Sequence, residues 1–229
     1  MPRRKPPRPG TPRRPRQVPE DTRARILAAA ERLFAERGVD AVSIRSVLKE
    51  AGVNVALAHY HFGSREGLIE ELLRTRVTAH EGAMIRAIDE VDARGKEASL
   101  EELLRAYFAP MARAVTENRS LGKLLAQLQV SPNPEIRAMG REAVRATLHR
   151  LGDSLVGRVP CGLQPQQFLV RLYMCVFMPA VFAAQWEALQ GSARKRFPDR
   201  MPTTELLIEE LVAFCAAGLR AEAGGGAER

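Results

Sequence analysis

Residues 43–63 read SIRSVLKEAGVNVALAHYHFG, and this stretch decides the fold. The pattern predicts two short helices, over residues 43–51 and 54–61, separated by a tight turn at Gly52. Glycine suits such a turn because it adopts positive φ without steric cost. Ser43 is the expected N-cap of the first helix. Two short helices around a glycine corner indicate a helix-turn-helix, although helical hairpins of this kind also occur in proteins that do not bind DNA.

Outside this stretch, apolar residues recur every three or four positions, which predicts an all-α protein of about nine helices. A helix is expected before the motif, stopping at Gly38, and a long helix after it, capped by Ser64. Later helices are expected to start near Ser99, Asn133, Pro165 and Thr203. The helix from Asn133 is expected to carry an apolar face as far as Leu155.

These patterns divide the chain into a small head and a larger body. We expect a three-helix DNA-binding head over residues 19–66 and a larger helical body over residues 67–221. The ends, residues 1–18 and 222–229, are expected to be a disordered basic arm and a disordered tail.

The positive charge is concentrated in the N-terminal arm. Lys plus Arg exceed Asp plus Glu by 35 − 27 = 8, and the arm, which has no acid, holds most of this excess. Its prolines exclude a helix and the apolar stretch of a signal peptide. The arm suits a polyanion such as DNA, and it equally suits a solvated tail without a partner, so both interpretations stay open.

The second helix of the motif is expected to present side chains that read base edges: Asn54, Val55, Leu57, His59, Tyr60 and His61. Asparagine can pair with adenine, histidine can donate to guanine or phosphate, and the aliphatic side chains can pack on thymine methyl groups. Contacts to phosphate are expected from hydroxyl and guanidinium groups, namely Ser43, Tyr60, Arg23, Arg45 and Arg65. Arg45 is also a candidate for a base contact.

Other chemistry finds little support in the sequence. His59 and His61 diverge by about 200° on a helix, so no metal site is predicted there. No nucleophile with a base, phosphate loop or cofactor motif is present, so neither an enzyme nor a bound cofactor is predicted. Cys161, Cys175 and Cys215 are far apart, without the close spacing of zinc ligands or redox dithiols, which favours a cytoplasmic setting.

Three strings carry a resemblance to a known family: ILAAAERLFAERG at 26–38, AGV at 51–53 and YHFGSREGL at 60–68. Together they resemble the DNA-binding head of the tetracycline-repressor (TetR) family. The chain departs from the usual pattern at Leu48, where Ala is common, at Val55, where Lys is common, and at Ala58-His59 in place of a Leu-Tyr pair.

The resemblance implies a homodimeric transcriptional regulator, mostly a repressor in this family. It implies dimerisation through the last two long helices, an effector pocket in each subunit, and release of a palindromic double-stranded DNA operator when an apolar small molecule binds. The string NVALAHYHF at 54–62 is similar to a subgroup that includes members responding to fatty acids or acyl-CoA thioesters. An acyl chain or acyl-CoA is therefore a candidate effector.

Two helices of the body combine methionine and aromatic residues with a proline, at Pro110 and Pro179, that would bend each helix. Such helices can enclose an apolar pocket, and they can equally form a packed core. The candidate pocket residues are Tyr107, Phe108, Met111, Arg171, Met174, Phe177, Met178 and Phe182. Arg171 suits a ligand carboxylate or phosphate, or an acid at the subunit interface. Arg171 and Pro179 also interrupt residues 168–186 as a membrane span, so this segment is expected to be a buried helix.

Two further functions remain in view. An architectural protein that coats DNA without sequence preference would rely on the basic arm. A ligand-carrying helical protein would have no DNA function at all. Neither would need the residues of the second helix of the motif to face DNA.

Overall fold

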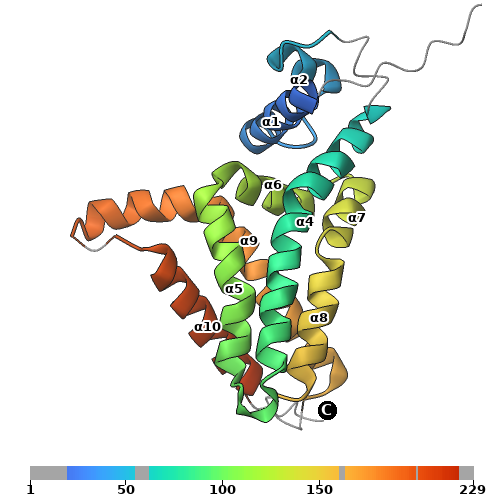
Figure 1. Cartoon of the computed structure of the whole chain (residues 1–229). Helices are drawn as coiled ribbons and strands as arrows, with labels where there is room; N and C mark the ends of the chain where they lie inside the picture. Colours follow the sequence, from blue (N-terminus) through green and yellow to red (C-terminus); the bar gives the residue numbers. More distant parts are fainter. Residues whose placement is uncertain (1–19, 55–61, 160–162, 200, 222–229) are drawn as a thin grey trace, which may run out of the picture.

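The computed structural model describes residues 20–54, 62–159, 163–199 and 201–221. These ranges contain helices joined by turns and loops, and no strand. The all-α prediction is therefore confirmed. Figure 1 shows a small head above a larger helical body. Helices α1 (Glu20–Arg37) and α2 (Ile44–Glu50) belong to the head, and α4 (Arg65–Asp92) runs from the head down the length of the body.

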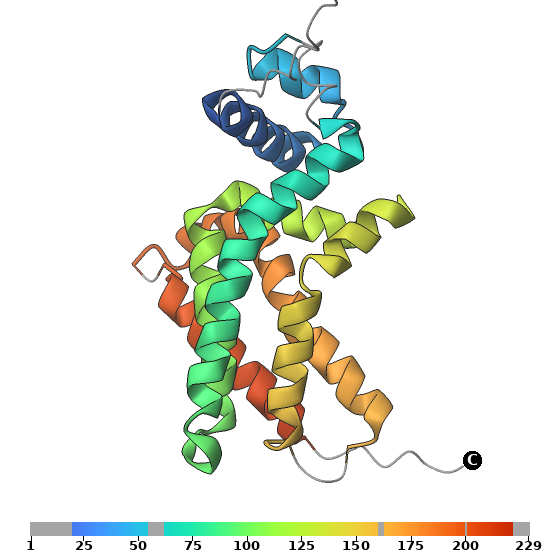
Figure 2. The same ribbon diagram turned by 45° about the vertical axis from the view of Figure 1, so that its right-hand side comes forward.

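The body is a bundle built around α4, which the rotated view in Figure 2 shows beside α8 and α5. After α4 the chain forms a short 3₁₀ helix η1 (Gly95–Glu97) and then α5 (Leu100–Glu117), α6 (Arg119–Val130), α7 (Pro134–Glu142), α8 (Arg145–Val156), α9 (Pro165–Arg196) and α10 (Thr204–Arg220). Helix α6 lies beneath the head, where it packs against α1.

The expected helix starts are confirmed by side-chain caps. Ser64 and Thr203 accept hydrogen bonds from the first turns of α4 and α10. Ser99 and Glu102 form a capping box, in which the Ser99 hydroxyl accepts from the Glu102 amide at 3.2 Å and the Glu102 carboxylate accepts from the Ser99 amide at 2.8 Å. Each cap satisfies backbone N–H groups that the helix itself leaves without partners.

The helix predicted from Asn133 as far as Leu155 is wrong in extent, because α7 ends at Glu142 and α8 begins at Arg145. The cause is tertiary. Gly140 of α7 lies so close to α6 that an added Cβ would meet the Cβ of Leu128 at 2.9 Å. Helix α7 is therefore packed tightly against α6. Helix α8 then turns away to lie along α4. The apolar period of the sequence continues across this corner and does not reveal it.

The head and the body share an apolar core. The cluster that contains Phe34 and Val47 of the head and Leu72 of α4 continues into Leu124 of α6 and Ile136 of α7. A second cluster fills the body around Phe108 and Leu211. The division into domains at residue 66 stays a prediction, and α4 passes through that position without a break in its helix.

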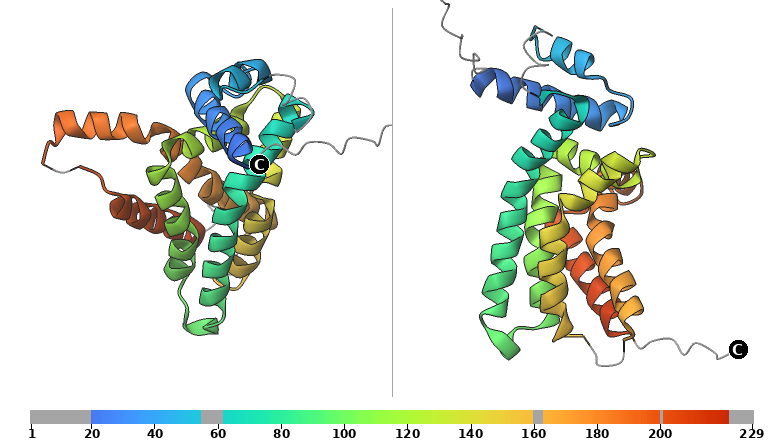
Figure 3. Two further views of the ribbon diagram at one scale, coloured as in Figure 1. Left: turned by 45° about the horizontal axis from the view of Figure 1, so that its top comes forward. Right: turned by 90° about the vertical axis from the view of Figure 1, so that its right-hand side faces the viewer.

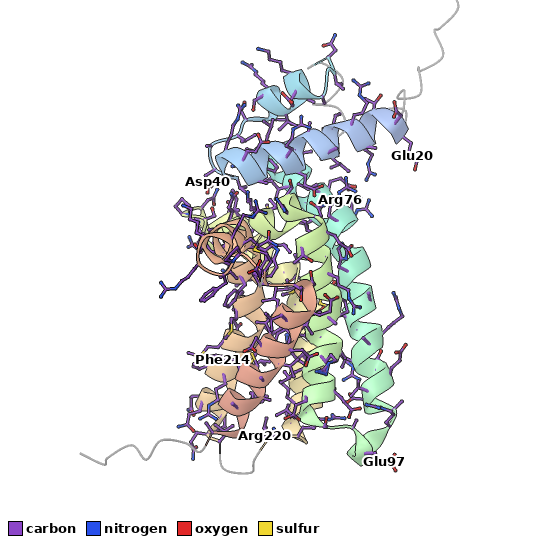
Figure 4. The ribbon with its side chains drawn as sticks, turned by 90° about the vertical axis from the view of Figure 1, so that its left-hand side faces the viewer. Glu20, Asp40, Arg76, Glu97, Phe214 and Arg220 are labelled. Atoms are coloured by element: carbon purple, nitrogen blue, oxygen red, sulfur yellow. The ribbon has the colours of Figure 1, made fainter. Side chains whose placement is uncertain are left out.

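Polar contacts also connect the head to the body. Glu31 of α1 is only 6% exposed, and its carboxylate accepts from the Arg76 Nε at 2.9 Å and the Asn118 Nδ2 at 2.6 Å. Gln127 of α6 accepts from the Val39 amide at 3.2 Å, just beyond α1. Figure 4 places Arg76 where α4 passes beneath α1. Helix α6 is therefore joined directly to the head.

Helix α9 is not buried all round, so the expectation of a buried helix over residues 168–186 is wrong for one face. Leu169, Val170, Tyr173 and Met174 are exposed apolar side chains on this face. Figures 1 and 3 show that α9 changes direction, so that its C-terminal part projects from the body. No helix in the described ranges has the length and apolar character needed to cross a membrane.

An ionic cluster joins α4 to α8. The Asp92 carboxylate lies 2.7 Å from the Arg150 Nη2 and 2.8 Å from the Arg158 Nη1, and it accepts a hydrogen bond from Ser154. Burial raises the pKa of Asp92, but the hydrogen bonds from Ser154 and Arg150 and the charges of both arginines outweigh it, so the pKa is lowered overall.

Because the folded pKa of Asp92 is lowered, its stabilising contribution is present above the ordinary aspartate value of about 3.9 and is lost as pH falls through the lower folded value. We expect Asp92→Asn to lower the free energy of unfolding by about 1–2 kcal/mol at pH 7. Thermal melts between pH 7 and pH 3 should show this difference shrinking below about pH 4. Asp153→Asn, an exposed site on α8, is the control, and an equal loss there would contradict the assignment.

Candidate nucleic-acid interface

The start of α2 is a well-formed helix N-terminus exposed to solvent. Ser43 has extended backbone angles, and its hydroxyl accepts from the Ser46 amide at 3.2 Å. The Ser46 hydroxyl donates to the Ser43 carbonyl at 2.6 Å. The prediction that Ser43 is the N-cap is confirmed. A capped N-terminus carries partial positive charge, which suits a phosphate group.

The turn after α2 is built by Gly52, as predicted. Gly52 has φ of 65°, and the amides of Gly52 and Val53 donate to the carbonyls of Lys49 and Leu48 at 3.1 and 3.0 Å. These two bonds make a Schellman motif, which ends a helix and turns the chain sharply. Arg25 of α1 donates to the Ala51 carbonyl and so fixes the turn to the head's first helix.

Several residues expected to contact DNA lie on the surface of this motif. Ser43, Arg45 and Asn54 are exposed, whereas Val47 and Leu48 are buried in the head. Lys49 is a further exposed cation that the sequence reasoning omitted. The signal was its spacing of four from Arg45, which places both side chains on one face of α2.

Two predicted phosphate contacts have partners within the protein. Arg23 is ion-paired with Glu71 of α4. Arg65 donates from Nε to the Val42 carbonyl at 3.0 Å and from Nη2 to the Val39 carbonyl. The remaining predicted residues, Val55, Leu57, His59, Tyr60 and His61, lie outside the described residues. The DNA contacts of all these side chains stay predictions.

Arg65 is bonded to the loop that leads into Ser43, so a positioning role can be separated from a phosphate contact. We expect Arg65→Ala to weaken DNA binding about tenfold while leaving the slope of log affinity against log salt unchanged. Arg45→Ala is the matched control, because loss of one phosphate contact should reduce that slope by about 0.9. Equal slope changes in both variants would show that Arg65 contacts phosphate.

The candidate pocket residues are divided between the body core and its surface. Tyr107 and Phe108 are buried and pack edge to face with ring centroids 5.1 Å apart. Met111, Phe177 and Met178 are partly buried, whereas Met174 and Phe182 are exposed. The Arg171 guanidinium donates to the Ala221 carbonyl at 2.6 Å, beyond the end of α10. A ligand role for these residues stays a prediction.

A groove lies between α9 and α10, with a volume of about 340 Å³. Its apolar lining includes Met178 and Phe182, which the sequence singled out, together with Trp186, Leu189, Pro202, Leu206, Leu207, Leu211 and Phe214. Glu210 is the charged residue among the described lining residues. The groove was not apparent from the sequence because it depends on how α9 and α10 pack against each other.

Comparison with known proteins identifies the family to which both the head and the body belong. A capped α2, a glycine turn and a long supporting helix are features of helix-turn-helix DNA-binding proteins. Residues 26–72 match the family of bacterial regulatory proteins called the tetR family, and residues 101–218, over half the chain, match the tetracyclin repressor-like C-terminal domain. The protein belongs to the TetR family of transcriptional regulators.

The curated relatives match over part of their length. The chain is 33% identical over 85 residues to the regulator TtgR of Pseudomonas putida, covering 36% of this chain and 40% of TtgR. It is 33% identical over 120 residues to the repressor Rv3405c of Mycobacterium tuberculosis, covering 51% of this chain and 59% of Rv3405c. The chain thus spans about half the length of these relatives.

Solved structures share the fold over nearly the whole chain. The fatty acid degradation regulator FadR from Bacillus halodurans aligns with a TM-score of 0.60 at 18% identity, covering 90% of this chain and all of FadR. The ketosteroid transcriptional regulator KstR2 of Mycobacterium tuberculosis aligns with a TM-score of 0.59 at 20% identity, covering 90% and 98%. At these identities the likeness establishes the fold alone.

Proposed function

We propose that the protein is a homodimeric repressor that binds a palindromic operator and releases it when an apolar small molecule binds the body. The observation that carries this proposal is the α2 motif, in which the Ser43 cap and the Gly52 turn leave Arg45 and Asn54 exposed. A helix N-terminus for phosphate and a following segment for base edges are the parts that sequence-specific recognition requires. Binding to chromosomal DNA also implies a cytoplasmic location.

The dimer is supported by apolar surface on the last two long helices. Large side chains on α9 and α10 are exposed in the single chain, namely Leu169, Val170, Tyr173, Met174, Phe182, Leu189, Leu206 and Phe214. Apolar surface of this extent is costly in water and marks an interaction site. A two-fold pairing through these helices would present two heads to two half-sites of one operator.

The groove between α9 and α10 is the candidate effector site. Its lining is almost wholly apolar, and the described lining residues include the carboxylate of Glu210 but no lysine or arginine. Charge complementarity therefore favours an uncharged apolar molecule or the chain of an amphiphile over the phosphates of an acyl-CoA. FadR is named for fatty acid degradation and KstR2 for ketosteroids. Fatty-acid chains and steroids are largely apolar molecules.

A ligand series with one chain length tests this assignment. Decanol, decanoate and decanoyl-CoA share one chain and differ only in the head group. Their thermal shifts therefore measure which head group the groove accepts. We expect decanol to raise the Tm and weaken operator binding, with decanoyl-CoA the least effective. Met178→Glu, which changes the groove lining outside the exposed apolar set named for the dimer, should abolish the shift, whereas Val156→Glu on α8 should not. No stabilisation by any of the three would contradict an apolar effector in this groove.

A further inference from the structure

A second groove, with a volume of about 550 Å³, lies between α4 and α7. Figures 1 and 2 show α7 beside the upper part of α4, on the opposite side of the molecule from the projecting end of α9. Its described lining residues include neither the exposed apolar set named for the dimer nor any of the predicted DNA contacts. The proposed function therefore leaves this groove without an occupant.

Carboxylates exceed cations in the described lining of this groove. It holds Glu70, Glu81 and Glu142 against Arg74, a balance of 1 − 3 = −2. The Arg74 guanidinium already donates to both carboxylate oxygens of Glu71, at 2.8 and 3.1 Å. The Glu70 side chain is exposed, and its carboxylate has no ion pair or hydrogen bond with the residues that the structure describes. The groove therefore attracts cations.

The other two carboxylates keep part of their capacity for a cation. One oxygen of Glu81 accepts from the Thr147 amide at 3.3 Å and the Thr147 hydroxyl at 3.2 Å, at the start of α8. Glu142 lies 2.8 Å from the Arg145 Nε, but both side chains are at least 60% exposed. Water screens such an exposed pair, so an incoming guanidinium can share the Glu142 carboxylate at little cost.

The N-terminal arm is attached beside this groove. Arg23 of α1 and Arg74 of the groove both pair with the Glu71 carboxylate, so the start of α1 lies two ionic contacts from the lining. Glu20, where the described chain begins, comes one helical turn before Arg23. The chain that precedes Glu20 therefore enters the molecule close to the upper end of the groove.

The composition of the arm complements this lining. Residues 1–18 hold seven cations, six prolines and no acid. An extended proline-rich chain of this length spans about 55 Å, at about 3.1 Å per residue. Glu70 and Glu81 are separated by about 17 Å along α4. The arm is therefore long enough to reach the groove and to run along it.

We propose that residues 1–18 dock in the groove of their own chain, and that DNA phosphates compete with the groove for them. The guanidinium groups pair with Glu70 and the neighbouring carboxylates, and the proline rings pack on Leu73, Val77 and Met139. Covalent attachment gives the arm an effective concentration of the order of mM, which favours it over a free cationic ligand.

Docking gives the arm a role that neither a solvated tail nor a permanent DNA clamp provides. While the arm is docked, its cations are withheld from phosphate, so binding to DNA of any sequence is weakened. Operator contacts made by the head hold phosphates near the arm and draw it out of the groove. This effect on operator binding rests on the proposed function, whereas docking itself does not.

Carbodiimide cross-linking of the full-length protein tests docking directly. Arg13→Lys keeps the charge of the arm and supplies an amine that can form a zero-length link to a carboxylate. We expect peptides that link position 13 to Glu70 or Glu142 within one chain, as shown with a mixture of isotope-labelled and unlabelled protein. Links confined to Glu20 and Asp21, which adjoin the arm, would overturn docking. Links found only between labelled and unlabelled chains would overturn docking within one chain.

Two charge reversals on α4 test the competition with DNA. Glu70→Lys and Glu90→Lys change the net charge equally at exposed positions, but only Glu70 lines this groove. We expect Glu70→Lys to bind scrambled DNA at least about threefold more tightly than Glu90→Lys, with a steeper salt slope, because the released arm adds phosphate contacts. The difference should vanish when residues 1–18 are removed.

Equal affinities and salt slopes in the two full-length variants would overturn the competition. A difference that persists without residues 1–18 would also overturn it, because the introduced side chain would then contact DNA itself. Failure of the wild type to prefer its own promoter over scrambled DNA would instead contradict the proposed function.

Discussion

Phe214→Glu is expected to leave the protein monomeric and to weaken binding to a palindromic operator at least about 100-fold. Phe214 is 66% exposed, and Figure 4 shows it partway along α10, away from the head. A charge at this position would be buried without a partner if the α9 and α10 faces of two copies met. Loss of the second head removes the gain in affinity from linked half-sites. Sedimentation equilibrium measures the assembly, and anisotropy with labelled operator measures the affinity.

The matched control is Val156→Glu, which adds the same charge at an equally exposed position on α8. It should remain dimeric and bind the operator normally. Thermal melts should show that both variants fold, because neither position is buried in the single chain. A dimeric Phe214→Glu variant with full operator affinity would contradict pairing through α10.

Gly67→Ala is expected to destabilise the head severely, although alanine is the better helix former. A Cβ at Gly67 would lie 2.2 Å from the backbone carbonyl oxygen of Phe62, which the chain cannot accommodate without moving the start of α4. Overpacking of this kind costs about 1–3 kcal/mol, so the Tm should fall by roughly 2–12 °C. Operator affinity should fall with it, since the same residues support the motif. Calorimetry and operator titration measure the two effects.

Gly157→Ala provides the comparison for this substitution. Gly157 follows α8 with φ of −86°, and a Cβ there would meet nothing within 4 Å. Its Tm should stay unchanged or rise slightly, because alanine loses less conformational entropy on folding. Equal destabilisation at both glycines would mean that the contact with Phe62 is not the cause.

Local signals explain why much of the fold was predictable. Ser43, Ser64 and Ser99 cap helices through bonds that reach only three residues along the chain, so sequence spacing reveals them. The same holds for Gly52, whose positive φ is a local property of the turn. The head was therefore recognisable from one stretch of sequence.

Features that depend on contacts across the chain could not be predicted in this way. Arg65 was expected at phosphate, but it reaches back to carbonyls 23 and 26 residues earlier. The groove between α9 and α10 depends in the same way on how these two helices pack. The exposed apolar face of α9 resembles that of a core helix because burial by a second copy and burial in a core select the same residues.

The central claim is that the helix-turn-helix reads sequence and the basic arm only adds charge. Affinity for DNA from the protein's own promoter and for scrambled DNA, measured across a salt series with and without residues 1–18, tests it most directly. A sequence-specific regulator should prefer its promoter at least about 1000-fold and should keep most of that preference without the arm. Equal affinity for both DNAs would contradict the claim. Loss of both the preference and the salt dependence when residues 1–18 are removed would contradict it as well.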